Sequence, residues 1–160
     1  TKVETEEIIE ESEELEEEII EEPDLEDVEV EVEVETETEA APTPTTYYAG
    51  GAPIDIDFLA KLMWAEGGTM SWNGQVYLCS AILNLCDMTG KSVWTAGHTY
   101  NMFSVAYIVD GVIPSQTQYD VINYVLNGGR VPDVAFFRTD YYHSFGTPLC
   151  AIDNVYFSTP

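Results

Sequence analysis

The chain is poor in basic residues, and this shortage excludes several classes of function. It holds five Lys and Arg against 30 Asp and Glu in 160 residues, so the formal net charge is −25. A nucleic-acid-binding surface needs clustered Lys and Arg to neutralise phosphates, and we therefore expect no such partner. The sequence also has no apolar run of about 18 residues or more, so we expect no membrane span.

Cysteine and histidine are also scarce, with three and two residues respectively. Cys79 and Cys86 would lie about 10 Å apart along one helix, which is too far for a disulfide between them. Cys150 could pair with either, but three buried free thiols are the interpretation we favour. There is no CxxC pair, and His98 and His143 are the only histidines, so neither a metal site nor a cofactor is expected.

The acidic residues are concentrated before residue 47. Residues 1–46 contain 21 acidic residues and one Lys, whereas residues 47–160 contain nine acidic and four basic residues. Residues 4–22 have near-helical apolar spacing and residues 28–39 alternate as in a strand. Repulsion between like charges opposes both structures, so we expect 1–46 to be a disordered acidic arm, with 47–53 as a linker. We favour a solvated tether over a segment that docks basic partners or cations.

Residues 54–160 are predicted to form one α+β domain that is mainly helical. A first helix is expected to begin at Asp55 or Asp57 and to end in a left-handed stop at Gly67–Gly68. A central helix is predicted over 75–87, a third over 115–126, and a shorter helical piece over 99–109. Two C-terminal strands, in DVAFFRTDYY and NVYFS, are predicted to form a small hairpin, with HSFGTPLC as the loop between them.

Glu66 is the only Glu after residue 40. It follows Leu59, Leu62 and Met63 at offsets of seven, four and three, which place it on the core face of the first helix. Burial should raise the pKa of such a carboxyl, as a general acid requires. Sequence alone leaves a second interpretation equally open, in which Glu66 is structural and is held by a hydrogen bond or by a cation such as Lys61 or Arg138.

Several segments in the same order resemble the SleB/CwlJ cell-wall hydrolases, which include the spore-cortex-lytic enzymes. They are DIDFLAKLMWAEGGTMSWNGQVYLCSAILN, MFS, VLNGG, FF, HSFGTPLC and DNVYFS, and together they cover about residues 54–158. The resemblance implies a lysozyme-like, mainly helical fold that cleaves peptidoglycan glycan strands, typically as a lytic transglycosylase. The sequence departs from the family pattern at Gly68, Met70 and Val155.

The resemblance also implies roles for individual residues. Glu66 matches the catalytic glutamate of the family. The positions that match other motif elements, and that we expect to bind substrate, are Gln75, Asn84, Phe103, Ser104, His143, Phe145, Gly146 and Tyr156. The implied partner is the peptidoglycan glycan strand, acted on by a monomer. The implied location is extracytoplasmic or cell-wall associated, although no signal peptide is visible in this chain.

A single glutamate fits a lytic transglycosylase better than an ordinary glycosidase. Ordinary glycosidases use two carboxylates, and the domain offers only unmarked aspartates as the second. A lytic transglycosylase needs one, because the 6-hydroxyl of the muramic residue attacks its own anomeric carbon. Three alternatives stay open: a hydrolytic muramidase or glucosaminidase, a non-catalytic module that binds glycans or proteins, and a cysteine enzyme that uses Cys150 with His143.

Overall fold

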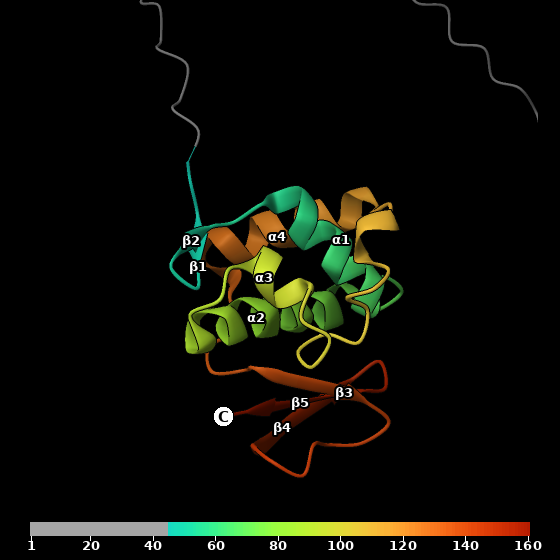
Figure 1. Ribbon diagram of the computed structural model, residues 1–160. Coiled ribbons are helices and arrows are strands. Elements are labelled where there is room, and N and C mark those ends of the chain that lie inside the picture. The colour runs from blue at the N-terminus through green and yellow to red at the C-terminus, as the bar shows by residue number, and fades with distance from the viewer. Residues whose placement is uncertain (1–44) are drawn as a thin grey trace, which may run out of the picture. The chain divides into compact units, whose positions relative to one another are not determined.

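The structure is a computed structural model and describes residues 45–160. The predicted acidic arm lies outside the described residues, except for Thr45 and Thr46. The described part is α+β: a short β-hairpin is followed by the helices and then by a small antiparallel sheet (Figure 1). Its helical elements are α1 (Ile56–Gly67), α2 (Trp72–Thr89), α3 (Val93–Gly97), η1 (Val109–Gly111), α4 (Gln116–Tyr124) and η2 (Val125–Gly129). Its strands are β1 (Tyr48–Ala49), β2 (Ala52–Pro53), β3 (Phe136–Thr139), β4 (Thr147–Ile152) and β5 (Val155–Thr159).

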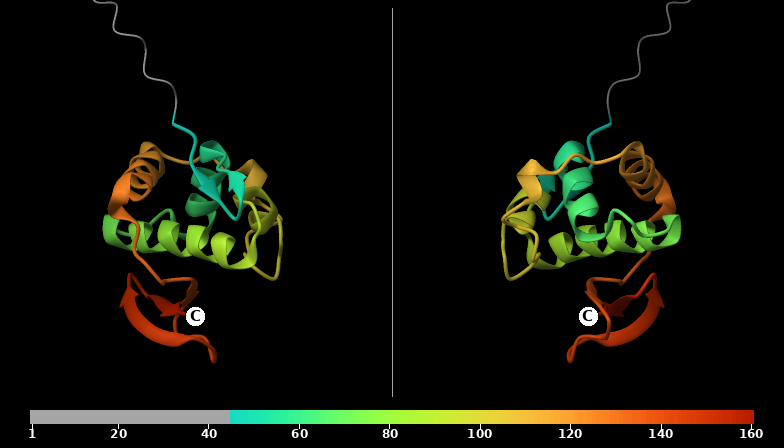
Figure 2. Two further views of the ribbon diagram at one scale, coloured as in Figure 1. Left: turned by 90° about the vertical axis from the view of Figure 1, so that its left-hand side faces the viewer. Right: turned by 90° about the vertical axis from the view of Figure 1, so that its right-hand side faces the viewer.

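The central position predicted for the second helix is confirmed. α2 lies between the other helices and the β3–β5 sheet, as both side views show (Figure 2). Apolar side chains are therefore buried around most of its circumference, and each stabilises the fold by roughly 1.5–3 kcal/mol relative to exposure. The buried apolar residues of α2 are Val76, Leu78, Cys79, Ala81, Ile82, Leu83 and Cys86.

Side-chain caps set the starts of the first two helices. The Asp55 carboxylate accepts a hydrogen bond from the Phe58 N–H at 3.0 Å, which confirms the predicted start of α1. α2 begins earlier than predicted because the Ser71 hydroxyl accepts from the Gly74 N–H at 3.3 Å. Oδ2 of Asp153, in the β4–β5 turn, accepts from the Ser71 N–H and hydroxyl at 2.8 and 2.6 Å. The sheet is thereby tied to the first turn of α2.

Two helix predictions were wrong. Gly68 has φ −61°, so α1 does not end in a left-handed residue. The helix predicted over 99–109 is replaced by separate turns, and a short helix, α3, forms before it. α3 begins there because the Ser92 hydroxyl accepts from the Thr95 N–H at 3.1 Å, a local cap that the apolar pattern alone does not reveal.

The third predicted helix is confirmed with a change at its end. The Ser115 N–H donates to the Gln118 side-chain oxygen at 2.9 Å and so fixes the start of α4. α4 then passes into η2, a single π-helical turn over Val125–Gly129. Gly128 has φ 109° and ends the helical conformation.

The predicted C-terminal hairpin was wrong, because the sheet has three strands in the order β3-β5-β4. β4 lies partly within the segment predicted to be a loop. Pro148 has no N–H to donate, which disfavours a strand except at the edge of a sheet. The strand forms nevertheless because β4 is at the edge of the sheet and its register with β5 shifts between Pro148 and Cys150.

The residues predicted to be a linker belong to the folded domain instead. β1 and β2 pair in an antiparallel hairpin, with Tyr48 opposite Pro53. Ala49 is buried, and the Gly50 N–H donates to Oδ1 of Asp87 on α2 at 2.7 Å. A flexible spacer would make no such contacts, so the folded domain begins before residue 54.

We expect Gly50→Ala to lower the free energy of unfolding by about 1–2 kcal/mol more than Gly51→Ala does. Both glycines have positive φ, +57° and +76°, so both substitutions carry backbone strain. Only at Gly50 would the new Cβ meet another group, the Lys91 carbonyl oxygen at 2.0 Å. Urea unfolding of both variants measures the difference. Equal losses would mean that the hairpin is not held against Lys91.

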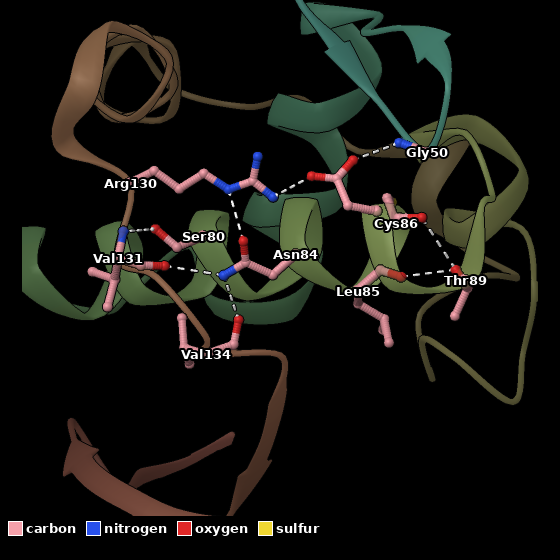
Figure 3. Close-up of polar contacts among 10 residues, drawn as sticks. Gly50, Ser80, Asn84, Leu85, Cys86, Thr89, Arg130, Val131 and Val134 are labelled. Carbon is pink, nitrogen blue, oxygen red and sulfur yellow. Dashed lines mark hydrogen bonds and ion pairs between the residues drawn. The ribbon is translucent and has the colours of Figure 1, made fainter. Parts of the chain in front are cut away.

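Polar contacts join α2 to the chain that enters the sheet (Figure 3). Nδ2 of Asn84 donates to the carbonyl oxygens of Val131 and Val134 at 3.0 and 2.6 Å. Oδ1 of Asn84 accepts from Nε of Arg130 at 2.8 Å, and Arg130 also pairs with Asp87 at 2.7 Å. Asn84 therefore holds the segment between η2 and β3 against the central helix.

Candidate functional site

One cavity lies where the end of α1, the 98–110 loop and β3 meet, and its volume is about 440 Å³. Ligand sites are typically concave, largely apolar and equipped with a few polar groups. The lining residues are Glu66, Leu85, Thr89, Tyr100, Asn101, Met102, Ser104, Ala135, Phe136, Phe137, Arg138, Thr139, His143, Phe145 and Val155. Four of the residues predicted from sequence are therefore brought to one place: Glu66, Ser104, His143 and Phe145.

Glu66 is the chemically distinctive group of this cavity. It lies in the last turn of α1, and its Oε1 is buried with no hydrogen-bond partner within residues 45–160. Burial raises the pKa of the Glu66 carboxyl above its ordinary value, and the backbone N–H of Val105 offsets part of that rise. The prediction that Glu66 lies on the core face of its helix thus agrees with the burial of Oε1. The raised pKa favours the protonated form of the carboxyl.

The cations considered as structural partners of Glu66 make other contacts. Nζ of Lys61 donates to the Asp110 carbonyl oxygen at 3.4 Å. The Arg138 guanidinium donates to the Tyr141 hydroxyl and lies over the Tyr141 ring, 3.9 Å from its centroid. Within the described chain, the ion pairs are His98–Asp110 and Arg130–Asp87. The observed contacts therefore do not favour a structural ion pair at Glu66.

Glu66 is also the only carboxylate among the cavity-lining residues of the described part. Glycosidases with two catalytic carboxylates hold them about 5–10 Å apart on either side of the scissile bond. The described lining holds no such pair, so Glu66 is the one carboxyl that it offers to a bound molecule.

Aromatic rings form one wall of the cavity. The rings of His143 and Phe145 stack with 4.6 Å between centroids, and Phe136 meets Phe145 edge-on at 5.1 Å. Nε2 of His143 lies 3.1 Å from the Phe137 carbonyl oxygen, so that nitrogen must carry a proton to make the hydrogen bond. Such a wall can pack against sugar rings. Nε2 of His143 is not free to bind a ligand, because it is hydrogen-bonded to the backbone.

Two of the predicted substrate-binding residues are buried instead. Nε2 of Gln75 donates to the Met70 carbonyl oxygen at 2.9 Å, and its Oε1 accepts from Gln118 at 2.7 Å. Phe103 is buried and packs near Phe137, with 6.2 Å between ring centroids. Both residues support the helices and the loop around the cavity without lining it.

Three other predicted residues also lie outside the lining. Asn84 is occupied by the backbone contacts described above. Gly146 has φ +77° and makes the turn into β4. Tyr156 pairs across the sheet with Arg138, and its ring meets Tyr142 edge-on at 4.9 Å. All three contact the backbone or the sheet outside the lining, although they share motifs with cavity residues.

The sequence interpretation missed several groups at the site. Arg138 was considered only as a partner for Glu66, although it is the only Lys or Arg among the described lining residues. Phe136 and Arg138 are two positions apart on β3, so their side chains point to the same face of the sheet. This spacing could have been detected in the sequence. Val105 had no local signal, because its contribution is a backbone N–H brought to Glu66 by the folding of a loop.

The cysteine-enzyme hypothesis finds no support in the thiols. Burial raises the pKa of Cys79 to about 12 and the pKa of Cys86 to about 11. Cys150 is half-buried and hydrogen-bonded to Tyr77, and burial raises its pKa as well. A catalytic thiol needs a lowered pKa and a positive neighbour, so these are structural free thiols.

We expect native alkylation by iodoacetamide to modify Cys150 first and to leave Cys79 and Cys86 unmodified. The two helix thiols are buried and poorly ionised, whereas Cys150 is partly accessible. Mass spectrometry of peptides before and after denaturation measures the order. Rapid native modification of Cys79 would contradict the packing of α2, and loss of activity upon modification of Cys150 would revive the cysteine mechanism.

Comparisons with protein-family models, curated proteins and solved structures found no match to this chain. Within residues 45–160, no cluster of three or more His, Cys, Asp or Glu is arranged to hold a metal ion. No helix in that part combines the length and apolarity that crossing a membrane requires. The cavity and its residues are therefore the features from which a function can be inferred.

Proposed function

We propose that the protein cleaves peptidoglycan glycan strands as a lytic transglycosylase, with Glu66 as its only catalytic carboxyl. The observation that carries this proposal is a cavity lined by a single carboxyl whose pKa is raised by burial. A protonated carboxyl near neutral pH is what a general acid for a glycosidic bond requires. The order of helices and sheet, with the carboxyl at a helix end beside the cavity, supports a lysozyme-like fold.

In this mechanism Glu66 transfers two protons. Its carboxylic acid first protonates the glycosidic oxygen, and the bond from that oxygen to the anomeric carbon of the muramic residue breaks. The Glu66 carboxylate then takes the proton of the 6-hydroxyl of the same residue, and that oxygen bonds to the anomeric carbon. The product is a 1,6-anhydro ring, no water is consumed, and Glu66 is protonated again at the end.

The aromatic wall and the single cation would bind the substrate. The stacked His143 and Phe145 rings offer a flat apolar surface to a sugar, whose C–H groups pack well against aromatic faces. Arg138 would meet an anionic group, such as a carboxylate of the stem peptide, because it faces no carboxylate within residues 45–160. We further propose that the protein acts as a monomer outside the cytoplasmic membrane, where its substrate lies.

We expect Arg138→Gln to raise KM on intact peptidoglycan by about tenfold, which corresponds to ~1.4 kcal/mol, with little change in kcat. Glycan strands stripped of their stem peptides should show no such difference between the variant and the original protein. Lys91→Gln is the matched control, since it removes the same charge outside the cavity. A fall in kcat without a change in KM would contradict a binding role for Arg138.

Mass spectrometry of digestion products tests the proposed reaction directly. Anhydro-muramic ends, one water lighter than reducing ends, are expected if the 6-hydroxyl is the nucleophile. Reducing muramic or glucosamine ends would indicate the hydrolytic alternative, and would require a second carboxylate outside the described lining. Binding to peptidoglycan without any product would favour the non-catalytic module.

A further inference from the structure

His98 and Asp110 close the loop that forms one wall of the cavity. His98 directly follows α3, and Asp110 lies in η1. Nε2 of His98 is 3.1 Å from Oδ2 and 3.2 Å from Oδ1 of Asp110. The lining residues between these two ends are Tyr100, Asn101, Met102 and Ser104.

Both ring nitrogens of His98 face hydrogen-bond acceptors. Nδ1 lies 2.8 Å from the Trp94 carbonyl oxygen, while Nε2 faces the Asp110 carboxylate. A neutral imidazole has one N–H and can donate to only one of them. Both contacts are hydrogen bonds only when the ring is an imidazolium, so the geometry selects the charged form.

The surroundings of His98 are consistent with a charged ring. The pKa of His98 is raised, and the hydrogen bond to the Trp94 carbonyl is the largest cause. Partial burial lowers this pKa, and Asp110 raises it further. On the side of α1, Phe58 stacks on the ring with 4.8 Å between centroids. Lys61 is the charged group that α1 brings to this region, and its Nζ donates to the Asp110 carbonyl oxygen rather than to the carboxylate.

The loop connects this pair to the proposed acid. The Val105 carbonyl oxygen accepts from the N–H groups of Ile108 and Val109 at 2.9 and 3.1 Å, which ties Val105 to the Asp110 end of the loop. At the other end, the Thr99 carbonyl oxygen accepts from the N–H of Phe103 at 3.0 Å. The Val105 N–H is the group that acts on the Glu66 carboxyl. Hydrogen-bonded turns therefore connect both ends of the loop to the segment that contacts Glu66.

We propose that His98 is a positioning residue for Glu66: as an imidazolium it joins both ends of the 98–110 loop and thereby holds Val105 against the Glu66 carboxyl. The catalytic consequence rests on the proposed function, whereas the loop closure does not. Because the pKa of His98 is raised in the folded protein, the closure is present while the ring is charged and faces the Asp110 carboxylate, and it is lost as pH rises through the pKa of His98. Glu66 also loses its proton as pH rises. Opening of the loop removes the Val105 N–H that stabilises the Glu66 carboxylate, the form that takes the proton of the 6-hydroxyl, so both changes disfavour activity at high pH.

The closure is tested without reference to activity by histidine 15N NMR and amide hydrogen exchange on the whole chain. We expect both nitrogens of His98 to be protonated at pH 6, and the protection factors of residues 99–109 to fall severalfold above the pKa of His98. Asp110→Asn should move both transitions to lower pH, while Lys91→Gln should move neither. A His98 ring that is singly protonated at pH 6, or loop protection that is independent of pH, would overturn the proposal.

The pH dependence of kcat/KM tests the link to Glu66. We expect the value for the original protein to fall with a limiting slope of one proton as Glu66 ionises, and to drop severalfold more as His98 loses its proton. His98→Gln should lack that severalfold drop and should have a severalfold lower plateau, because the loop is then open at every pH. An unchanged profile in His98→Gln would overturn the positioning role. Were Glu66→Gln fully active while the NMR results held, the proposed function alone would fail.

Discussion

We expect Glu66→Gln to abolish the cleavage of purified peptidoglycan, with a loss of at least ~10³-fold in kcat. General acid–base catalysis by one group commonly contributes about 10²–10⁴-fold, and Glu66 is proposed to act in both proton transfers. Glutamine keeps the shape of the side chain but can neither give nor take the proton. The rate of release of soluble muropeptides measures the loss.

Asp120→Asn is the matched control for this experiment. It makes the same chemical change at an exposed carboxylate on α4, outside the cavity lining, and should leave the rate unchanged. Full activity of Glu66→Gln would end the proposal that Glu66 is the catalytic acid. Persistent binding of the inactive variant to peptidoglycan would show that the loss is in chemistry rather than in recognition.

The same variant should be more stable than the original protein at neutral pH. Burial raises the pKa of Glu66 in the folded state, so its contribution to stability is present at low pH and is lost as pH rises through that pKa. Glutamine does not ionise and escapes this loss. A gain of about 1 kcal/mol corresponds to a rise in Tm of roughly 4–8 °C for a small domain, and it should vanish in acid. Such a trade of stability for reactivity is typical of a functional site and not of a structural residue.

We expect Asn84→Ala to lower the free energy of unfolding by about 3 kcal/mol or more. The substitution leaves the carbonyl oxygens of Val131 and Val134 and the Nε of Arg130 without their partner, and each unsatisfied buried group costs about 1–3 kcal/mol. These costs are not additive, because the segment can relax toward water. Urea unfolding measures the change, and the exposed Asn73→Ala on the same helix is the control.

Asn84→Ala also distinguishes a structural role of Asn84 from a substrate-binding role. If Asn84 bound substrate, its removal would raise KM even at temperatures where the fold is intact. The hydrogen bonds of Asn84 to the backbone imply instead that KM stays within about twofold below the unfolding transition. An increase of tenfold or more in KM with unchanged stability would instead indicate that Asn84 binds the substrate.

The sequence was most informative where one residue decides the local structure. Asp55 and Ser115 marked helix starts, and the position of Glu66 relative to Leu59 and Leu62 indicated a core-facing carboxyl. These features are set within one or two helical turns, so a local pattern is sufficient to predict them. The central role of α2 followed in the same way, from apolar residues on more than one face.

The sequence was least informative where contacts join distant segments. Asn84 and Gln75 share motifs with the site, yet their partners are backbone or buried groups more than one element away, such as Val131 and Gln118. The contribution of Val105 to Glu66 depends on the folding of a loop whose conformation is not helical. Ser104 and His143 line the cavity, and Arg138 lies there too because it is on the strand that forms the wall.

The register shift in β4 affects the tendency of this protein to associate through its sheet edge. An edge strand normally offers unpaired N–H and carbonyl groups to any extended chain, and so invites aggregation. In β4 the edge carries Pro148 and an adjacent register shift, so one N–H is missing and the spacing of the others is irregular. This side of the sheet is therefore a poor template for a further strand, which favours a domain that stays separate at high concentration.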